Sequence, residues 1–366
     1  MRTGRPSAMT RYAWLRAATQ RLPFMKKIAV AVRRRRPGSQ HGHMPSTNCS
    51  NKSRIIPTAR LVRELSAAQK LLNQYERGWR PGHFYSPIPS LEEVRRRESQ
   101  IFAEPGPILP GIELREQAQL ALLDRMAEVY HDQPFTGGQP TNRRYLPENE
   151  NYSLPEAIVL YCMIRLARPQ RIIEIGSGHS SCAILDTNES LGGYIQCTFI
   201  EPYSELLLSL IKRTDRKHVE VVESALQDVD REIFAQLKAG DILFVDSTHV
   251  AKVGSDVNQI IFELLPALPA GVHVHFHDIY YPFEYPREWI YQGRAWNEAY
   301  VLRAFLQYNM RFGIEFFNSF MGRFHNDALS RQMPICAQQI GSSLWLQPNA
   351  QSSALDQPST HGPHKA

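Results

Sequence analysis

From residue 171 onward, short apolar runs alternate with amphipathic stretches, and this alternation constrains the fold more than any other feature of the chain. The apolar runs have the length of strands, and the stretches between them place apolar residues at helical spacing. Such alternation is typical of a parallel sheet whose two faces are covered by helices. The sequence therefore predicts an α/β domain with a Rossmann-like, doubly wound sheet of seven strands. We expect the strands at 171–175, 194–201, 219–223, 241–246, 271–278, 313–320 and 343–347, with helices near 183–190, 204–213, 227–237, 256–267 and 297–309.

Composition divides the 366 residues into four parts. Residues 1–52 are polar and basic, and residues 349–366 are rich in Gln, Ser, Pro and His, so both are predicted to be disordered tails. Residues 53–150 contain three stretches with helical periodicity, which predict a helical cap. Residues 151–348 contain the strand–helix alternation and form the predicted main domain.

The net charge of +6 belongs to the first tail. Residues 1–40 hold eleven Lys and Arg and no acidic residue, so residues 41–366 carry a formal charge of −5. Proteins that bind nucleic acid carry basic surfaces on the folded domain, so we expect no nucleic-acid partner.

The N-terminal region does not match a membrane or secretory segment. No apolar run approaches the roughly 18 residues that span a bilayer, so we expect no membrane span. The apolar part of residues 25–36 is shorter than that of a secretory signal. A transit peptide and a later start codon remain alternatives for this Arg-rich region.

The five cysteines are odd in number and widely spaced, and they form no C-x-x-C pair. This spacing argues against a disulfide framework and against a cysteine-rich zinc site. We therefore expect the cysteines to be reduced, buried thiols in a cytoplasmic protein. The residues are Cys49, Cys162, Cys182, Cys197 and Cys336.

A glycine-rich turn follows the first predicted strand, in the stretch "RIIEIGSGHSSC". A dinucleotide fingerprint has a third glycine, which is missing here. A carboxylate such as Glu174 beside a helix N-terminus would repel a pyrophosphate, but it suits a ligand with an ammonium and a sulfonium, such as S-adenosylmethionine. Glu201 ends the second strand, where a carboxylate can accept both ribose hydroxyls. Glu201 alone would suit NAD equally, whereas the two carboxylates together favour S-adenosylmethionine.

Over about residues 150–348, these motifs resemble those of the class I S-adenosylmethionine-dependent methyltransferases. "EIGSGHSS" looks like their first motif, "FIEP" like the second, "ESALQD" like the adenine-side loop and "DILFVDSTHV" like the fourth-strand motif. The two C-terminal strands are similar to the hairpin that carries their reversed seventh strand, so we expect the last strand to be antiparallel. The pairing of "FVDSTHV" with "HFHDIYYP" is similar to a branch that includes sugar and natural-product O-methyltransferases. The resemblance implies an enzyme with cofactor contacts at Glu174, Gly176, Ser177, Gly178, Ser181, Glu201, Pro202, Ala225, Gln227 and Asp246.

The carboxyl ends of the fourth and fifth strands carry the candidates for chemistry, because ligands bind at this edge of an open α/β sheet. An alcohol that accepts a methyl group needs a base or a metal to take up or weaken its proton. Some members of the resembled branch use a metal and some do not, so a divalent cation such as Mg²⁺ stays open. The expected catalytic residues are His249, His277 and Asp278, and the expected metal ligands are Asp246 and Asp278.

The predicted function is O-methylation of a hydroxyl on a glycosyl or other polar metabolite, so the partner is a small-molecule or glycan acceptor. The sequence is compatible with an oligomer. Residues 280–300 are rich in aromatic side chains and are predicted to form a lid or substrate loop, or to pack against the cap.

Two alternatives remain open. "HVHFHD" could serve a metal-dependent hydrolase or oxygenase, because H-x-H places two imidazoles on one face of a strand. That hypothesis leaves Glu174 and Glu201 unexplained, and we expect His273 and His275 to be neutral, hydrogen-bonded core histidines. The chain could also be a cofactor-binding protein without catalysis, or a nucleic-acid binder that uses its basic tail.

Overall fold

The computed structural model describes residue 66 and residues 79–136 and 143–350. The chain divides into the units Met1–Tyr75 and Glu76–Ala366, and the helices and strands with described bounds lie in the second unit. The predicted disordered tails and most of the first predicted helix lie outside the described residues.

The core of the second unit is a seven-stranded sheet in the order β3-β2-β1-β4-β5-β7-β6. β1 to β5 pair in parallel, and β7 is antiparallel to both β5 and β6. The prediction of a seven-stranded α/β sheet with an antiparallel last strand is therefore confirmed. The strands are β1 (Arg171–Ile175), β2 (Gln196–Ile200), β3 (Val219–Val222), β4 (Ile242–Val245), β5 (His273–Phe276), β6 (Phe312–Phe317) and β7 (Leu344–Pro348).

The strand order reverses between β1 and β4, which lie at the centre of the sheet. Ile175 pairs with Val245 at their carboxyl ends, so the segments that follow them leave the sheet side by side. Such a switch point is where open α/β sheets bind their ligands.

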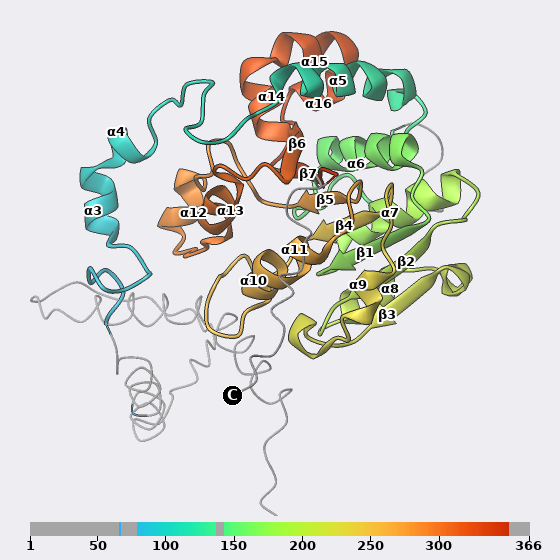
Figure 1. Cartoon of the computed structure of the whole chain (residues 1–366), viewed down its shortest axis with the longest axis horizontal. Coiled ribbons are helices and arrows are strands. Elements are labelled where there is room, and N and C mark those ends of the chain that lie inside the picture. Colours follow the sequence, from blue (N-terminus) through green and yellow to red (C-terminus); the bar gives the residue numbers. More distant parts are fainter. Residues whose placement is uncertain (1–65, 67–78, 137–142, 351–366) are drawn as a thin grey trace, which may run out of the picture. The chain divides into compact units, whose positions relative to one another are not determined.

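Helices cover the sheet, since all four residues of β4 are buried and a strand buried on both faces needs a layer on each side. Figure 1 shows α5, α14, α15 and α16 gathered beside α6. The described helices are α3 (Leu91–Arg96), α4 (Glu98–Ile101), α5 (Glu116–Tyr130), α6 (Leu154–Ala167), α7 (His179–Ser190), α8 (Glu205–Leu210), η2 (Arg213–Lys217), η3 (Leu226–Asp228), α9 (Glu232–Ala235), α10 (Asp256–Gln259), the π-helical η4 (Ile260–Leu264), α11 (Leu265–Ala267), α12 (Arg287–Tyr291), α13 (Glu298–Leu306), α14 (Asn318–Phe324), α15 (Asn326–Gln332) and α16 (Pro334–Ala337).

The predicted strand at 313–320 is too long at its C-terminal end. β6 ends at Phe317, and α14 begins at Asn318. The buried Asn318 side chain donates a hydrogen bond to the Ile340 carbonyl at 2.8 Å, which ties the start of α14 to the loop before β7. α14, α15 and α16 were not predicted from the sequence. α15 contacts α5, and α16 contacts α6.

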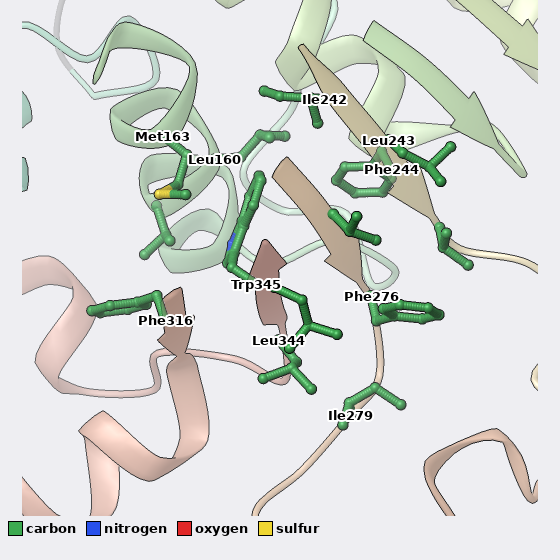
Figure 2. Close-up of a cluster of buried hydrophobic side chains, with 14 of the residues drawn as sticks. Leu160, Met163, Ile242, Leu243, Phe244, Phe276, Ile279, Phe316, Leu344 and Trp345 are labelled. Atoms are coloured by element: carbon green, nitrogen blue, oxygen red, sulfur yellow. The ribbon is translucent and has the colours of Figure 1, made fainter. Parts of the chain in front are cut away.

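The core between α6 and the sheet is closed by the side chain of Trp345 on β7. Figure 2 shows Leu160 and Met163 of α6 beside this indole, which is 1% exposed. Burying a large apolar side chain of this kind stabilises a fold by about 1.5–3 kcal/mol.

His275 of β5 belongs to this core. It is fully buried and stacks on Phe244 with ring centroids 3.8 Å apart. Burial lowers the pKa of His275 well below its usual value, so the ring is neutral, as predicted. The expected hydrogen bond is absent, because neither ring nitrogen has a partner among the described residues. His273, which is less buried, has Nδ1 2.7 Å from a carboxylate oxygen of Glu315.

α5 lies within the predicted cap region but packs against α6 and β6. Its buried Gln119 donates to the Leu114 carbonyl at 2.5 Å and accepts from the Phe317 backbone N–H at 2.8 Å. These bonds join α5 to the edge strand of the sheet. The domain boundaries proposed from composition stay a prediction.

Four cysteines, Cys162, Cys182, Cys197 and Cys336, are buried and free, as predicted. Cys49 lies outside the described residues. Across residues 79–136 and 143–350, no helix has the length and apolar character needed to cross a membrane.

Candidate active site

The turn after β1 is built around Gly176, whose φ is +81°. A Cβ at this position would lie 1.8 Å from the carbonyl oxygen of Asp246, so no other residue fits without a backbone shift. The Asp246 backbone N–H in turn donates to the Ile175 carbonyl at 2.9 Å. The glycine therefore lets the first loop lie directly against the end of β4.

Glu174 is buried beneath this turn. Its two carboxyl oxygens accept hydrogen bonds from the hydroxyls of Ser180 and Ser181 in the first turn of α7, each at 2.5 Å. Burial raises the pKa of Glu174 to about 8. The carboxyl group therefore orients the start of α7 from below the loop.

Glu201 follows β2 and contacts the glycine loop directly. It accepts a hydrogen bond from the Ser177 backbone N–H at 3.2 Å and one from the Tyr203 backbone N–H at 2.8 Å. Three further predicted cofactor residues lie in the segments after β2 and β3. They are the exposed Pro202, the cap residue Ala225 and Gln227, which donates to the Gly254 carbonyl at 2.9 Å.

A cavity of about 630 Å³ opens at the carboxyl ends of β1, β4 and β5, within the usual range for small-molecule sites. It is lined by residues 177–180, residues 246–249, His277 and Asp278, together with the start of α6 and the aromatic segment after β5. The predicted residues Glu174, Gly176, Ser181, Glu201, Pro202, Ala225 and Gln227 are not among its lining residues.

Ser177 and Ser247 line this cavity, and their hydroxyl oxygens are buried with no hydrogen-bond partner among the described residues. Buried polar groups in folded proteins are almost always hydrogen-bonded. Such unpaired groups beside a cavity fit a ligand that carries polar atoms.

Asp246 lies between two imidazoles. One of its carboxylate oxygens is 3.2 Å from Nδ1 of His277 and 3.4 Å from Nε2 of His249. Although burial opposes its charge, these two rings hold the pKa of Asp246 well below its usual range.

His249 is fixed by the N-terminus of α13. Its carbonyl oxygen accepts hydrogen bonds from the backbone N–H groups of Asn297 and Glu298, at 3.0 and 3.1 Å, and its Nδ1 is 2.8 Å from a carboxylate oxygen of Glu298. These contacts hold His249 at a φ of +59°, which is uncommon for a non-glycine residue. Although burial disfavours its charge, Asp246 and Glu298 raise the pKa of His249 to about 10.

His277 lies in a similar position on the other side of Asp246, with its Nε2 3.4 Å from Glu156. Burial opposes its charge, but Asp246, Asp278 and Glu156 raise its pKa well above the usual value. Glu156 also accepts the Ser342 backbone N–H at 2.9 Å. Despite its burial, contact with His277 lowers the pKa of Glu156 to about 2.

Asp278 is the carboxylate of this cluster with no imidazole nitrogen closer than 3.8 Å. It accepts a hydrogen bond from the Ser342 hydroxyl at 3.0 Å and faces the cavity. Burial raises the pKa of Asp278 above its usual value. A carboxylate in this position can accept a proton from a bound hydroxyl.

The structure thus brings together the predicted residues Asp246, His249, His277 and Asp278. It adds two carboxylates that the sequence analysis did not assign to the site. Glu156 is visible in the sequence only as part of a capping box with Ser153, which the structure contains, and Glu298 only as an acidic residue in the first turn of α13.

The metal prediction for Asp246 and Asp278 stays a prediction. Within the described ranges, no group of three or more His, Cys, Asp or Glu side chains is arranged to hold a metal ion. One carboxylate oxygen of Asp246 faces two imidazoles, and one carboxylate oxygen of Asp278 accepts a hydrogen bond from the Ser342 hydroxyl.

Comparison with known proteins identifies a domain that contains part of the lining of this cavity. A family model described as "Methyltransferase domain" matches residues 173–279, which run from β1 to just beyond β5. The chain is 36% identical over 163 residues to an uncharacterized protein of Archaeoglobus fulgidus, which covers 43% of this chain and 73% of the archaeal protein.

The chain is also similar to two solved structures. One is an SAH-bound methyltransferase of Podospora anserina, at 14% identity and a TM-score of 0.35, covering 72% of this chain and 99% of that one. The other is an O-methyltransferase of Bacillus cereus in complex with SAH, at 15% identity and a TM-score of 0.32, covering 61% of this chain and 88% of that one. The chain therefore belongs to the family of that archaeal relative, and its residues 173–279 form a methyltransferase domain.

Proposed function

We propose that this protein transfers the methyl group of S-adenosylmethionine to a hydroxyl of a small polar acceptor, such as a glycosyl metabolite. The observation that carries the proposal is the cluster of Asp246, His249, His277 and Asp278 at the edge of a cavity in the methyltransferase domain.

The cofactor would lie on the side of the cavity formed by the glycine loop. The unpaired hydroxyls of Ser177 and Ser247 fit a ligand with several polar groups, and Glu201 lies next to the loop. Bound there, S-adenosylmethionine supplies an electrophilic methyl group on a sulfonium. Glu174 acts through Ser180, which it holds at the cavity wall. The proposed cofactor site comprises the residues predicted from the sequence, with Glu174 acting from beneath the loop: Glu174, Gly176, Ser177, Gly178, Ser181, Glu201, Pro202, Ala225, Gln227 and Asp246.

The acceptor hydroxyl would lie against Asp278. As the acceptor oxygen took the methyl group and the carbon–sulfur bond of the sulfonium broke, the Asp278 carboxylate, whose burial favours proton uptake, would accept the hydroxyl proton. The charged rings of His249 and His277 stabilise the negative charge that develops on the oxygen. Alignment of the reacting atoms at about 3 Å supplies much of the acceleration.

The alternative based on the H-x-H pair is not favoured. His275 is fully buried in the core and His273 pairs with Glu315, and neither lines the cavity. A hydrolase or oxygenase would need both imidazoles at a site that substrate can reach.

The first experiment is calorimetric titration of the full chain with S-adenosylmethionine and, separately, with NAD. We expect S-adenosylmethionine to bind and NAD not to bind, and we expect Glu201→Ala to weaken the binding of S-adenosylmethionine. Absence of S-adenosylmethionine binding would overturn the proposed function.

A second experiment follows transfer of labelled methyl groups to a panel of hydroxylated sugars and phenols. Asp278→Asn should abolish transfer and leave cofactor binding unchanged, whereas Asp132→Asn, which removes an exposed charge outside the cavity, should retain activity. Repeating the assay with EDTA and with added Mg²⁺ tests the metal prediction. Activity that survives EDTA contradicts a required cation.

A further inference from the structure

We propose that Arg294 binds an anionic group of the acceptor, a carboxylate or a phosphate, while Trp289 and Trp296 hold the adjoining ring. The proposal rests on the proposed function, because it places the acceptor in the cavity beside Asp278. It defines the acceptor class as small hydroxylated molecules that carry a negative charge.

Arg294 is held between two indole rings at the cavity wall. Its guanidinium carbon lies 4.2 Å from the ring centroid of Trp289 and 5.0 Å from that of Trp296. The two indoles meet nearly edge to face, with centroids 5.3 Å apart. A guanidinium stacked on aromatic faces keeps the donors at its edge available for a planar anion.

Arg294 has no counterion among the described residues. It is the one Arg or Lys among the described lining residues, and no carboxylate of the described residues forms an ion pair with it. Of the four carboxylates that line the cavity, Asp246 and Glu156 are each close to an imidazole, and Asp278 and Glu150 form no ion pair with Arg294. An anion carried by the ligand would complete the pairing, since guanidinium binds carboxylate and phosphate through two parallel hydrogen bonds.

The backbone around Arg294 is ordered by hydrogen bonds at the end of α12. The Arg294 N–H donates to the Trp289 carbonyl, and the Gly293 N–H donates to the Ile290 carbonyl, both at 3.0 Å. Arg294 and Trp289 therefore keep a fixed relation to one another. A preorganised side chain binds its ligand with a smaller loss of conformational entropy.

The same aromatic group connects Arg294 to the proposed chemistry. The ring of Trp296 also packs on His249, with centroids 4.3 Å apart. One indole thus separates the free guanidinium from the imidazole beside Asp278. This spacing suits a single small molecule that presents its anionic group to Arg294 and its hydroxyl to Asp278.

The test uses benzoate and phenyl phosphate as anionic probes and benzamide as their uncharged match. Binding to the full chain is measured by calorimetry and by tryptophan fluorescence, with and without SAH. We expect at least one anionic probe to bind about tenfold more tightly than benzamide, as expected for a charge-assisted hydrogen bond. The preference should disappear in Arg294→Gln and persist in Arg165→Gln, a control that removes an arginine stacked on Tyr161 outside the cavity.

Comparison of the two anionic probes shows whether the site accepts a carboxylate or a phosphate. Retention of phenyl phosphate binding but not of benzoate binding in Arg294→Lys indicates a phosphate site, because lysine offers a point charge in place of a planar fork. Equal binding of all three probes to the wild type, no measurable binding, or a charge preference that survives Arg294→Gln would each overturn the proposal.

Titration with SAH separates this proposal from the proposed function. Arg294→Gln should leave the affinity for SAH within about twofold of the wild type, since the cofactor is placed at the glycine loop. If SAH fails to bind the wild type, the proposed function fails, and the charge preference measured without SAH still decides the role of Arg294.

Discussion

The carboxylate of Glu298 lies 2.8 Å from Nδ1 of His249, and both side chains are buried. Because the same two residues also share a backbone hydrogen bond, the first turn of α13 fixes both the main chain and the ring of His249. The other ring nitrogen, Nε2, is thereby directed toward Asp246 and Asp278. Glu298 is therefore a positioning residue for the imidazole at the cavity.

Replacing Glu298 with Gln should lower kcat for methyl transfer by about 10- to 100-fold, the usual effect of losing a partner that orients a functional imidazole. The KM for the acceptor and the affinity for SAH should stay near their wild-type values, because Glu298 is not among the cavity-lining residues. Steady-state kinetics and calorimetry measure both. Glu288→Gln, an exposed change in α12, is the control and should behave like the wild type. A Glu298→Gln enzyme with unchanged kcat would contradict this role.

Gly176→Ala should destabilise the protein by at least about 3 kcal/mol or prevent folding. The added Cβ meets the Asp246 carbonyl oxygen at 1.8 Å, and the φ of +81° adds backbone strain. The control is Gly106→Ala, since a Cβ there meets nothing within 4 Å. Urea unfolding of both variants gives the comparison. Equal midpoints for the two variants would show that the loop relaxes around the methyl group.

The fold could be predicted closely where the sequence alternates between two periodicities. β1 has the predicted bounds, and β2 to β5 each lie within the predicted strand. The prediction is wrong after Phe317, where the apolar run continues from the edge strand into α14. Burial is similar on both sides of that boundary, so hydrophobicity alone does not mark it.

Only the part of the site that follows the strand ends could be predicted from the sequence. Asp246, His249, His277 and Asp278 follow two adjacent strands, so the position of each strand end predicts their meeting. Glu298 reaches the site from 49 residues beyond His249, and the contact between Glu156 and Ser342 joins positions 186 residues apart. Such contacts depend on how helices pack against the sheet, which no local pattern encodes.

The Glu156–Ser342 contact depends on a glycine that the sequence analysis did not single out. Gly341 has a φ of +85°, and a Cβ there would lie 2.1 Å from Cγ of Glu156. The close approach lets the loop before β7 donate its backbone N–H to this carboxylate.

Arg144→Met should destabilise the protein by about 3–5 kcal/mol. The buried guanidinium pairs with Asp186 at 2.6 Å and with Asp215, which joins α7 to η2. Removing it leaves two buried carboxylates without their cation. Arg165→Met, which breaks an exposed pair with Asp132 at 3.4 Å, should cost less than about 1 kcal/mol. Urea unfolding compares the two, and equal losses would show that the buried network contributes no more than a surface pair.

The buried carboxyl group of Glu174 should cause the free energy of unfolding to fall as pH rises. Burial raises its pKa from 4.5 to about 8 in the folded state, so between these values the folded protein binds a proton that the unfolded chain releases. Its contribution to the free energy of unfolding is therefore fully present below about pH 4.5 and falls as pH rises toward 8, by up to about 1.4 kcal/mol per pH unit. Glu174→Gln keeps an amide that can bond to Ser180 and Ser181 but does not titrate. The difference in unfolding free energy between Glu174→Gln and the wild type, measured in urea at pH 5, 7 and 9, should therefore increase with pH in favour of the variant. Glu232→Gln, at an exposed position, should show a constant difference, and a constant difference for Glu174→Gln as well would mean that the buried carboxyl group keeps an ordinary pKa.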